Sequence, residues 1–158
     1  MAGAAAAMAA MWWLCTLTGT SIAIVPFTTS IVVIFGAPGS VLASSRSIVG
    51  GHLICSAVTL GLAGVFGYEA WVAAAALGIG TGAMIATRTF HPPAGINAMI
   101  IVVHGLDWDY LLAPVGVGAV LCALASAAFG RWPAATAAAG AARRRPAPET
   151  GEAVSPQH

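Results

Sequence analysis

The chain has 158 residues, of which 59% are hydrophobic and 7% charged, and its formal net charge is +1. Soluble domains carry about 25% charged residues, so this composition excludes a soluble globular enzyme. The chain contains no lysine and has no strongly basic stretch in its apolar part, so it offers no surface for nucleic acid. These features predict an all-α integral membrane protein whose main partner is the lipid bilayer.

Four long apolar segments have the length of transmembrane helices, because about 20 apolar residues span the hydrocarbon core. Proline, glycine and charged residues separate them, and Ser47 is expected to cap the second helix. The final helix is expected to be continuous up to the Arg131-Trp132-Pro133 stop. The expected helices are Ala4–Thr20, Ile48–Phe66, Ala70–Arg88 and Tyr110–Gly130.

Two further apolar segments are too short to cross the bilayer comfortably by themselves. They are Phe27–Phe35, which follows Pro26, and Ala94–His104, which follows Pro92 and Pro93. A helix rises about 1.5 Å per residue, so each reaches only about half of a core of roughly 30 Å. We therefore expect them to be broken or re-entrant helical segments.

The charged residues predict how the segments are oriented. Positive residues mark the cytoplasmic side of a membrane protein. One set of alternate connections carries the arginines, and the other carries three acidic residues. The first set holds Arg46, Arg88, Arg131 and Arg143–Arg145, and the second holds Glu69, Asp107 and Asp109.

The order of elements is the same in each half of the chain: long helix, proline break, short helix, long helix. The charges orient the two halves oppositely, which predicts a three-plus-three inverted repeat. The alternative is a four-helix bundle in which the short segments are merely tilted or paired. The tail, residues 133–158, is expected to be a disordered cytoplasmic segment. The expected location is the inner (plasma) membrane of a bacterial cell, with several spans and a cytoplasmic C-terminus.

The breaks predict a site for a small anion. A helix that starts inside the membrane directs unpaired N–H groups and its positive dipole end into the interior, where anions bind readily. Neither break contains an acidic residue, which favours an anion, or a neutral solute, over a metal cation, and no cofactor is expected. The candidate binding residues are Thr28, Thr29, Ser30, Arg88, His91, Gly95 and Asn97.

Three ordered motifs resemble the HPP family of bacterial and plastid membrane proteins. They are Thr87–Ala98 with its His91-Pro92-Pro93 core, Phe35–Ser40, and Ser47–Leu53. The resemblance implies a compact multi-helix membrane domain, here residues 1–132, and a role in nitrite transport like that attributed to plastid and cyanobacterial members. The chain departs from the family at Ser44–Ser47, where members often carry Gln-Pro and Asn around the arginine. Residues expected to be structural are Gly50, Gly51, His52, Pro92 and Pro93.

The leading functional prediction is a homo-oligomeric transporter or channel for a small inorganic anion, with nitrite as the candidate. The alternative is a non-transporting membrane scaffold or sensor subunit. An intramembrane enzyme using His52, His91 and His104 is the weakest reading, because the chain has no HExxH or GxSxG motif and no paired carboxylates in its apolar segments. His91 could donate a hydrogen bond to the anion, carry a proton, or cap the broken helix. Arg88 could bind the anion or extend to the membrane surface.

Overall fold

The computed structural model describes residues 2–19 and 21–129, and the regular structure in these ranges is entirely helical. The tail expected to be disordered lies outside the described residues. The elements, with η for short 3-10 or π turns, are α1 (Ala2–Leu17), η1 (Ser21–Ala23), α2 (Ile24–Gly36), η2 (Val41–Ala43), α3 (Ser45–Phe66), α4 (Ala70–Ala86), η3 (Pro92–Gly95), α5 (Ile96–His104), α6 (Trp108–Tyr110), η4 (Leu111–Gly116) and α7 (Val117–Phe129).

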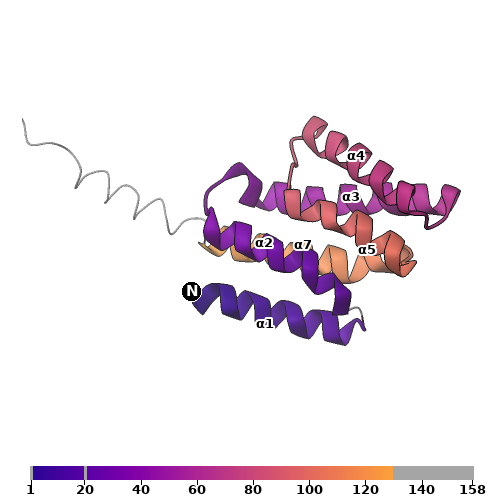
Figure 1. Cartoon of the computed structure of the whole chain (residues 1–158). Coiled ribbons are helices and arrows are strands. Elements are labelled where there is room, and N and C mark those ends of the chain that lie inside the picture. The colour runs from indigo at the N-terminus through magenta and orange to yellow at the C-terminus, as the bar shows by residue number, and fades with distance from the viewer. Residues whose placement is uncertain (1, 20, 130–158) are drawn as a thin grey trace, which may run out of the picture.

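The main helices run alternately in opposite directions along a common bundle (Figure 1). The long helix α3 contacts α4, α5 and α7, and α2 packs between α1 and α7. Two helices of the described chain are long and apolar enough to cross a membrane, namely α3 and the composite Trp108–Phe129. The other apolar helices, Ala2–Leu17, Ser21–Gly36, Ala70–Ala86 and Pro92–His104, are shorter.

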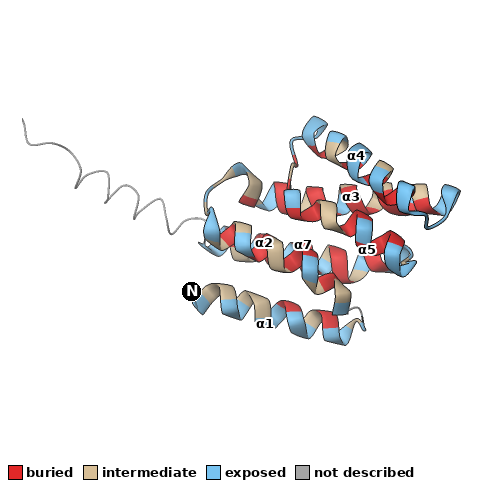
Figure 2. Ribbon diagram, in the orientation of Figure 1, coloured by how far each residue is buried: buried red, intermediate tan, exposed pale blue. Residues whose placement is uncertain are grey.

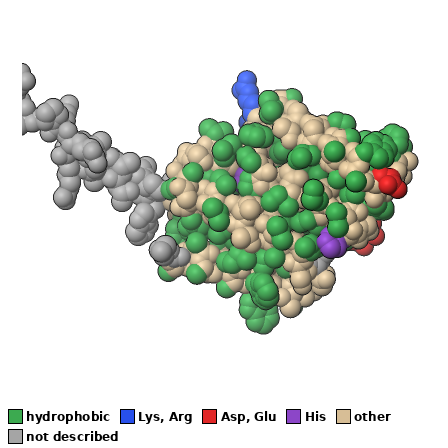
Figure 3. All heavy atoms as spheres, in the orientation of Figure 1, with side chains coloured by type: hydrophobic (Ala, Val, Ile, Leu, Met, Phe, Trp, Pro, Cys, Tyr) green, Lys and Arg blue, Asp and Glu red, His purple; other side chains and the backbone are tan. Residues whose placement is uncertain are grey.

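The two ends of the bundle differ in charge. At one end the Arg46 guanidinium donates to the Thr87 carbonyl oxygen at 2.8 Å, which places the start of α3 beside the end of α4. At the opposite end the Tyr68 hydroxyl donates to the Leu106 carbonyl oxygen at 3.1 Å, which joins the turn before Glu69 to the turn before Asp107. Basic and acidic side chains accordingly project from separate places in the surface view (Figure 3).

Most of the surface between the ends is apolar. Large side chains such as Trp12, Val32, Ile79 and Leu124 are more than half exposed. The buried residues form stripes that face the interior of the bundle (Figure 2). A surface with exposed apolar residues around the sides and charges at the ends suits a bilayer rather than water.

The sequence predicted that Pro26 precedes the first short helix, but Pro26 lies inside this helix. α2 begins at Ile24 rather than Phe27, and η1 adds another turn before it, so Pro26 lies in the first turn of the helix. A proline is tolerated there because the N–H groups of the first turn have no partner within the helix. The segment is therefore longer than expected, and Thr28 lies within the helix rather than at its start.

The start of α3 and the course of the last helix also differ from the expectation. α3 begins at Ser45, and its N-cap is Ser44, whose side chain accepts a hydrogen bond from the Ser47 N–H at 3.2 Å. The expected cap, Ser47, is thus already inside the helix. The last helix is not continuous: Ala113 is extended (φ −145°, ψ 124°) directly before Pro114. The ring of a proline disfavours helical angles in the preceding residue, which explains the break.

Candidate functional site

Five buried polar side chains from five segments meet in the interior of the bundle. Ser30 lies on α2, His52 on α3, His91 just before η3, Asn97 on α5 and Tyr110 at the end of α6. The first four are fully buried, and Tyr110 is 4% exposed. Since the surrounding helices are apolar, this polar cluster is the natural candidate for a functional site.

The cluster is a continuous chain of hydrogen bonds. Ser30 Oγ lies 3.0 Å from His52 Nε2 and 2.9 Å from His91 Nε2. His52 Nδ1 lies 2.9 Å from Asn97 Nδ2, and the Tyr110 hydroxyl donates to Asn97 Oδ1 at 3.1 Å. At the other end His91 Nδ1 lies 2.7 Å from the carbonyl oxygen of Leu42. The chain therefore extends from η2, near Arg46, to Tyr110, near the acidic end of the bundle.

The hydrogen-bond partners at the two ends of this network determine which imidazole nitrogens carry protons. The Leu42 carbonyl can only accept, so His91 Nδ1 carries a proton, and Nε2 of the neutral ring accepts from the Ser30 hydroxyl. The amide nitrogen of Asn97 can only donate, so His52 Nδ1 accepts and its Nε2–H donates to Ser30 Oγ. Both assignments meet at Ser30 without conflict, so two neutral imidazoles satisfy each of these bonds. The Ser30 hydroxyl then does not donate to the Pro26 carbonyl, which lies 2.9 Å away.

Two glycines of α3 allow His91 to reach this position. A Cβ at Gly51 would lie 2.8 Å from the His91 Cβ and 3.0 Å from the Thr89 carbonyl oxygen. A Cβ at Gly50 would lie 2.5 Å from the Thr89 Cγ2 atom. The segment 89–91 therefore packs directly on the backbone of α3, which explains why two adjacent glycines precede His52.

The opposite side of the cluster is closed by Phe27. Its ring centroid lies 5.0 Å from that of His52, and the two imidazoles are 5.3 Å apart by the same measure. The Phe27 ring occupies the space that a side chain at Gly118 would need. The Phe27 ring and the His91 segment thus fix His52 from two sides.

The structure brings together three of the residues that the sequence had marked as candidates, Ser30, His91 and Asn97. Thr28 and Thr29 are elsewhere engaged. The Thr28 hydroxyl donates to the Ile24 carbonyl at 2.7 Å, and the Thr29 hydroxyl donates to the Pro26 carbonyl at 2.8 Å. These are bonds within α2, so neither hydroxyl is part of the cluster.

Arg88 lies outside the cluster, at the charged end of the bundle. It is exposed and has a left-handed backbone (φ 56°). Its N–H bonds to the Ile85 carbonyl at 3.1 Å, and the Thr89 N–H bonds to the Met84 carbonyl at 2.8 Å. This pair of bonds is a Schellman motif, which usually has glycine at the left-handed position. Arg88 thus terminates α4 and turns the chain toward His91.

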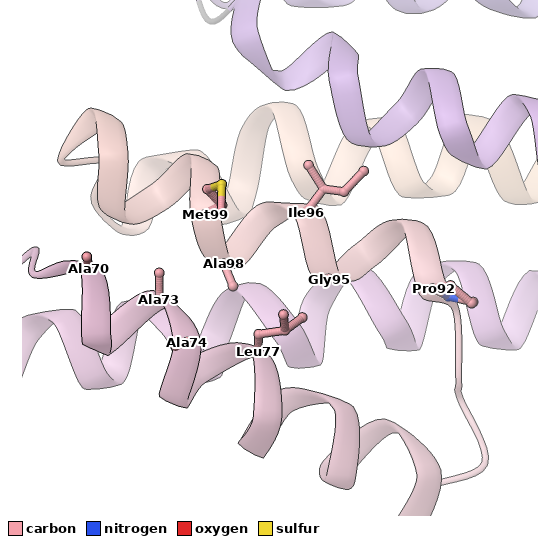
Figure 4. Close-up of a pocket in the computed structure, with 9 residues that line it drawn as sticks. All are labelled: Ala70, Ala73, Ala74, Leu77, Pro92, Gly95, Ile96, Ala98 and Met99. Carbon is pink, nitrogen blue, oxygen red and sulfur yellow. The ribbon is translucent and has the colours of Figure 1, made fainter.

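Gly95 also lies outside the cluster, on the outer side of the segment formed by η3 and α5. It lines a groove of about 480 Å³ between α4 and the η3–α5 segment (Figure 4). The lining is apolar and includes Leu77, Ile96 and Met99. A Cβ at Gly95 would lie 2.9 Å from the Leu77 Cδ1 atom, so this glycine accommodates a leucine of α4.

The sequence did not mark Tyr110 of the cluster or Ser56, which lies beyond it on α3, as site residues. The sequence marked Tyr110 only as the expected start of the last helix, and the fold reveals that its hydroxyl points inward to Asn97. Ser56 lies one turn beyond His52 on the same face of α3 and is fully buried. Its hydroxyl is the one buried side-chain polar atom of the described ranges without a hydrogen-bond partner. In the sequence, the helical spacing between His52 and Ser56 was the one signal that the two side chains share a face of α3.

The described structure places no carboxylate and no set of metal ligands at the cluster. No group of three or more His, Cys, Asp or Glu side chains in the described part of the chain is arranged to hold a metal. Glu69, Asp107 and Asp109 are exposed and lie near the opposite end from Arg46. The cluster itself contains donors and neutral imidazoles and has no carboxylate.

Comparison with known proteins agrees with the motifs and with a transmembrane protein. The family model "HPP, transmembrane region" matches residues 1–138. A curated transmembrane protein of Dictyostelium discoideum is 34% identical over 102 residues, which cover 60% of this chain and 33% of that protein. The chain therefore spans about a third of the length of that relative. No solved structure shows significant similarity. The chain belongs to the HPP family of transmembrane proteins.

Proposed function

We propose that the protein is a small-anion transporter or channel, with the buried polar cluster as the place where the anion is recognised. One observation carries this proposal: five polar side chains meet inside an apolar bundle, and none is a carboxylate. Polar groups at membrane depth are costly, and they commonly mark the path of a solute. Nitrite is the first candidate because of the resemblance of the motifs to HPP proteins attributed with nitrite transport.

The arrangement of the helices supports an inverted repeat of α1–α2–α3 and α4–α5–α7. α2 packs on α7 as α5 packs on α3, and α3 and α7 meet between them. The glycine contacts are reciprocal as well. Phe27 of the first half sits against Gly118 of the second, and His91 of the second half sits against Gly51 of the first. Such a repeat places a transport site at the interface of the two halves.

Ser56 supplies an unused hydrogen bond beside the cluster. Its hydroxyl is buried and unpaired, although a buried polar group without a partner destabilises a fold. An anion that entered between α3 and its neighbours would accept this hydrogen bond. His52 lies one turn away on the same face of α3, so such an anion would lie beside the cluster.

The charges at the ends favour entry of an anion from the arginine side. Arg46 and Arg88 lie together where α4 ends and the chain leads to His91. By the positive-inside rule this side is cytoplasmic in a multi-pass protein of a bacterial plasma membrane. The small bundle leaves little material to enclose a path, so we further propose that the protein is a homo-oligomer.

One observation favours the alternative, a non-transporting scaffold or sensor subunit. Every hydrogen bond within the cluster is satisfied by the protein itself, as in a network that only fixes the helix packing. The two functions differ in what Ser56 does, because its hydroxyl stabilises nothing in the described structure. Its removal is harmless to a scaffold and harmful to an anion path.

The test is anion flux into liposomes that contain the purified protein, with nitrite, nitrate and chloride as probes. Ser56→Ala is expected to fold as well as the wild type, because it removes an unpaired hydroxyl, yet to lower the flux at least several-fold. Thr59→Val is the matched control: it removes another buried hydroxyl of α3, one that is bonded to the Cys55 carbonyl at 2.7 Å. Absence of flux for all three anions in the wild type contradicts the proposal.

A further inference from the structure

Ser30 has one hydroxyl hydrogen but two acceptors within reach. Its Oγ lies 2.9 Å from the Pro26 carbonyl oxygen and 2.9 Å from His91 Nε2. When the hydrogen points to His91, that ring must be neutral, as derived above. When it points to Pro26, the lone pairs of Ser30 Oγ can both accept. The hydroxyl can therefore adapt to a change at His91 by rotation alone.

We propose that this cluster is a proton-binding site, with His91 Nε2 as the atom that takes up the proton. A hydronium ion from the aqueous phase gives its proton to Nε2 and leaves as water, and one N–H bond forms. The Ser30 O–H bond remains intact and turns to the Pro26 carbonyl. Ser30 Oγ then accepts from both imidazoles, so the charged cluster keeps every hydrogen bond that the neutral one has.

The neighbours make His91 a better acceptor than His52. A proton on His52 would have to bind Nδ1, which already accepts from the Asn97 amide. The amide would then need to turn over, and the Tyr110 hydroxyl would lose its acceptor. The two rings are 5.3 Å apart, so a charge on one opposes a charge on the other. The pair of imidazoles accordingly takes up a single additional proton.

No other charge of the described chain balances this proton. The further titratable groups buried among the packed helices are the Tyr110 phenol and the thiols of Cys15, Cys55 and Cys122. Glu69, Asp107 and Asp109 are exposed near the far end, Arg46 is bonded to the Thr87 carbonyl, and Arg88 is exposed. A lone positive charge in an apolar interior is unstable, and an anion beside it lowers that cost.

Proton and anion therefore each promote binding of the other, which is reciprocal by thermodynamic linkage. This inference rests on the proposed function and specifies it: the anion and one proton move together. The same geometry limits proton leak. Asn97 is a neutral amide that neither gives nor takes a proton. Proton transfer along the hydrogen-bond network therefore cannot pass from His52 to Tyr110, so the cluster can bind a proton but does not conduct one across the bundle.

The test uses liposomes with purified wild-type protein, an internal pH-sensitive dye, and nitrite, nitrate or chloride. With equal anion concentrations on both sides and an alkaline interior, the wild type is expected to accumulate the transported anion inside several-fold. With equal pH on both sides, an inward anion gradient is expected to acidify the interior. Protein-free vesicles correct for nitrite that crosses as its neutral acid. His91→Gln, which cannot bind the proton, is expected to abolish the pH-driven accumulation.

His104→Gln is the matched control, because His104 is exposed at the end of α5 and is expected to leave the coupling unchanged. Flux along an anion gradient with no change of internal pH, and no response to a pH gradient, would overturn the proton site while leaving the transport function in place. No flux under any gradient would instead remove the transport function. Equal pH-driven accumulation by His91→Gln and wild type would also exclude His91 as the proton acceptor.

Discussion

The two faces of the segment from His91 to Met99 differ sharply. The inner face presents His91 and Asn97, which are fully buried and hydrogen-bonded across to α2 and α3. The outer face presents Gly95 and Met99 to an apolar groove beside α4 (Figure 4). This short segment thus separates a polar interior with specific hydrogen bonds from an outer surface that is only required to be apolar. Changes on the two faces should have very different consequences.

The largest difference is expected between Asn97→Ala and Met99→Ala. The first leaves the Tyr110 hydroxyl and His52 Nδ1 without partners, at about 1–3 kcal/mol for each unpaired group. The second removes a side chain that is 63% exposed and should change stability by less than about 0.5 kcal/mol. Unfolding of both variants by a graded denaturing detergent in mixed micelles measures the two costs. Equal costs would mean that the polar network does not hold this segment in place.

The next effect separates two glycines of the same helix. Gly51→Ala forces a Cβ against the His91 Cβ and the Thr89 backbone, and overpacking of this kind costs about 1–3 kcal/mol. Gly61→Ala is the matched control, since Gly61 is exposed and nothing lies within 4 Å of its added Cβ. The control should be neutral or slightly stabilising, because alanine favours a helix. The same unfolding titration reports both, and a neutral Gly51→Ala would contradict the close packing of His91.

The smallest effect belongs to the outer face. Gly95→Ala places a Cβ near the end of the Leu77 side chain, which can rotate away into the groove. Its cost in unfolding free energy should stay below about 0.5 kcal/mol. Anion flux should also be unchanged, although the sequence had marked Gly95 for binding. A strong loss of flux with normal stability would show that the groove side takes part in transport.

The candidate site was only partly accessible from the sequence. The proline breaks marked Ser30, His91 and Asn97 because polar residues beside a break must find partners inside the membrane. Tyr110 could not be found, since an aromatic residue next to Asp109 is also typical of a membrane interface. The direction of its hydroxyl depends on how α6 meets α5, which involves contacts distant in sequence.

The elements were easier to predict than their ends. The all-helical class followed from the apolar segments, but the start of α2 was placed too late. The sequence treats Pro26 as an interruption, whereas the first turn of a helix accommodates it. Pro114 was overlooked in the opposite way: a single proline within a long apolar run still breaks the helix, because Ala113 cannot keep helical angles before it.

The bond between Ser30 and His91 joins residues 61 positions apart and has a consequence for biogenesis. When only the segments up to α3 have been synthesised, Ser30 and His52 already exist, while His91, Asn97 and Tyr110 do not. Ser30 and His52 can then bond to each other, and Ser30 to the Pro26 carbonyl, but Ser30 still lacks His91 and His52 still lacks Asn97. The polar interior of the first half therefore stays incomplete until the second half is made and supplies one further partner to each of these two side chains.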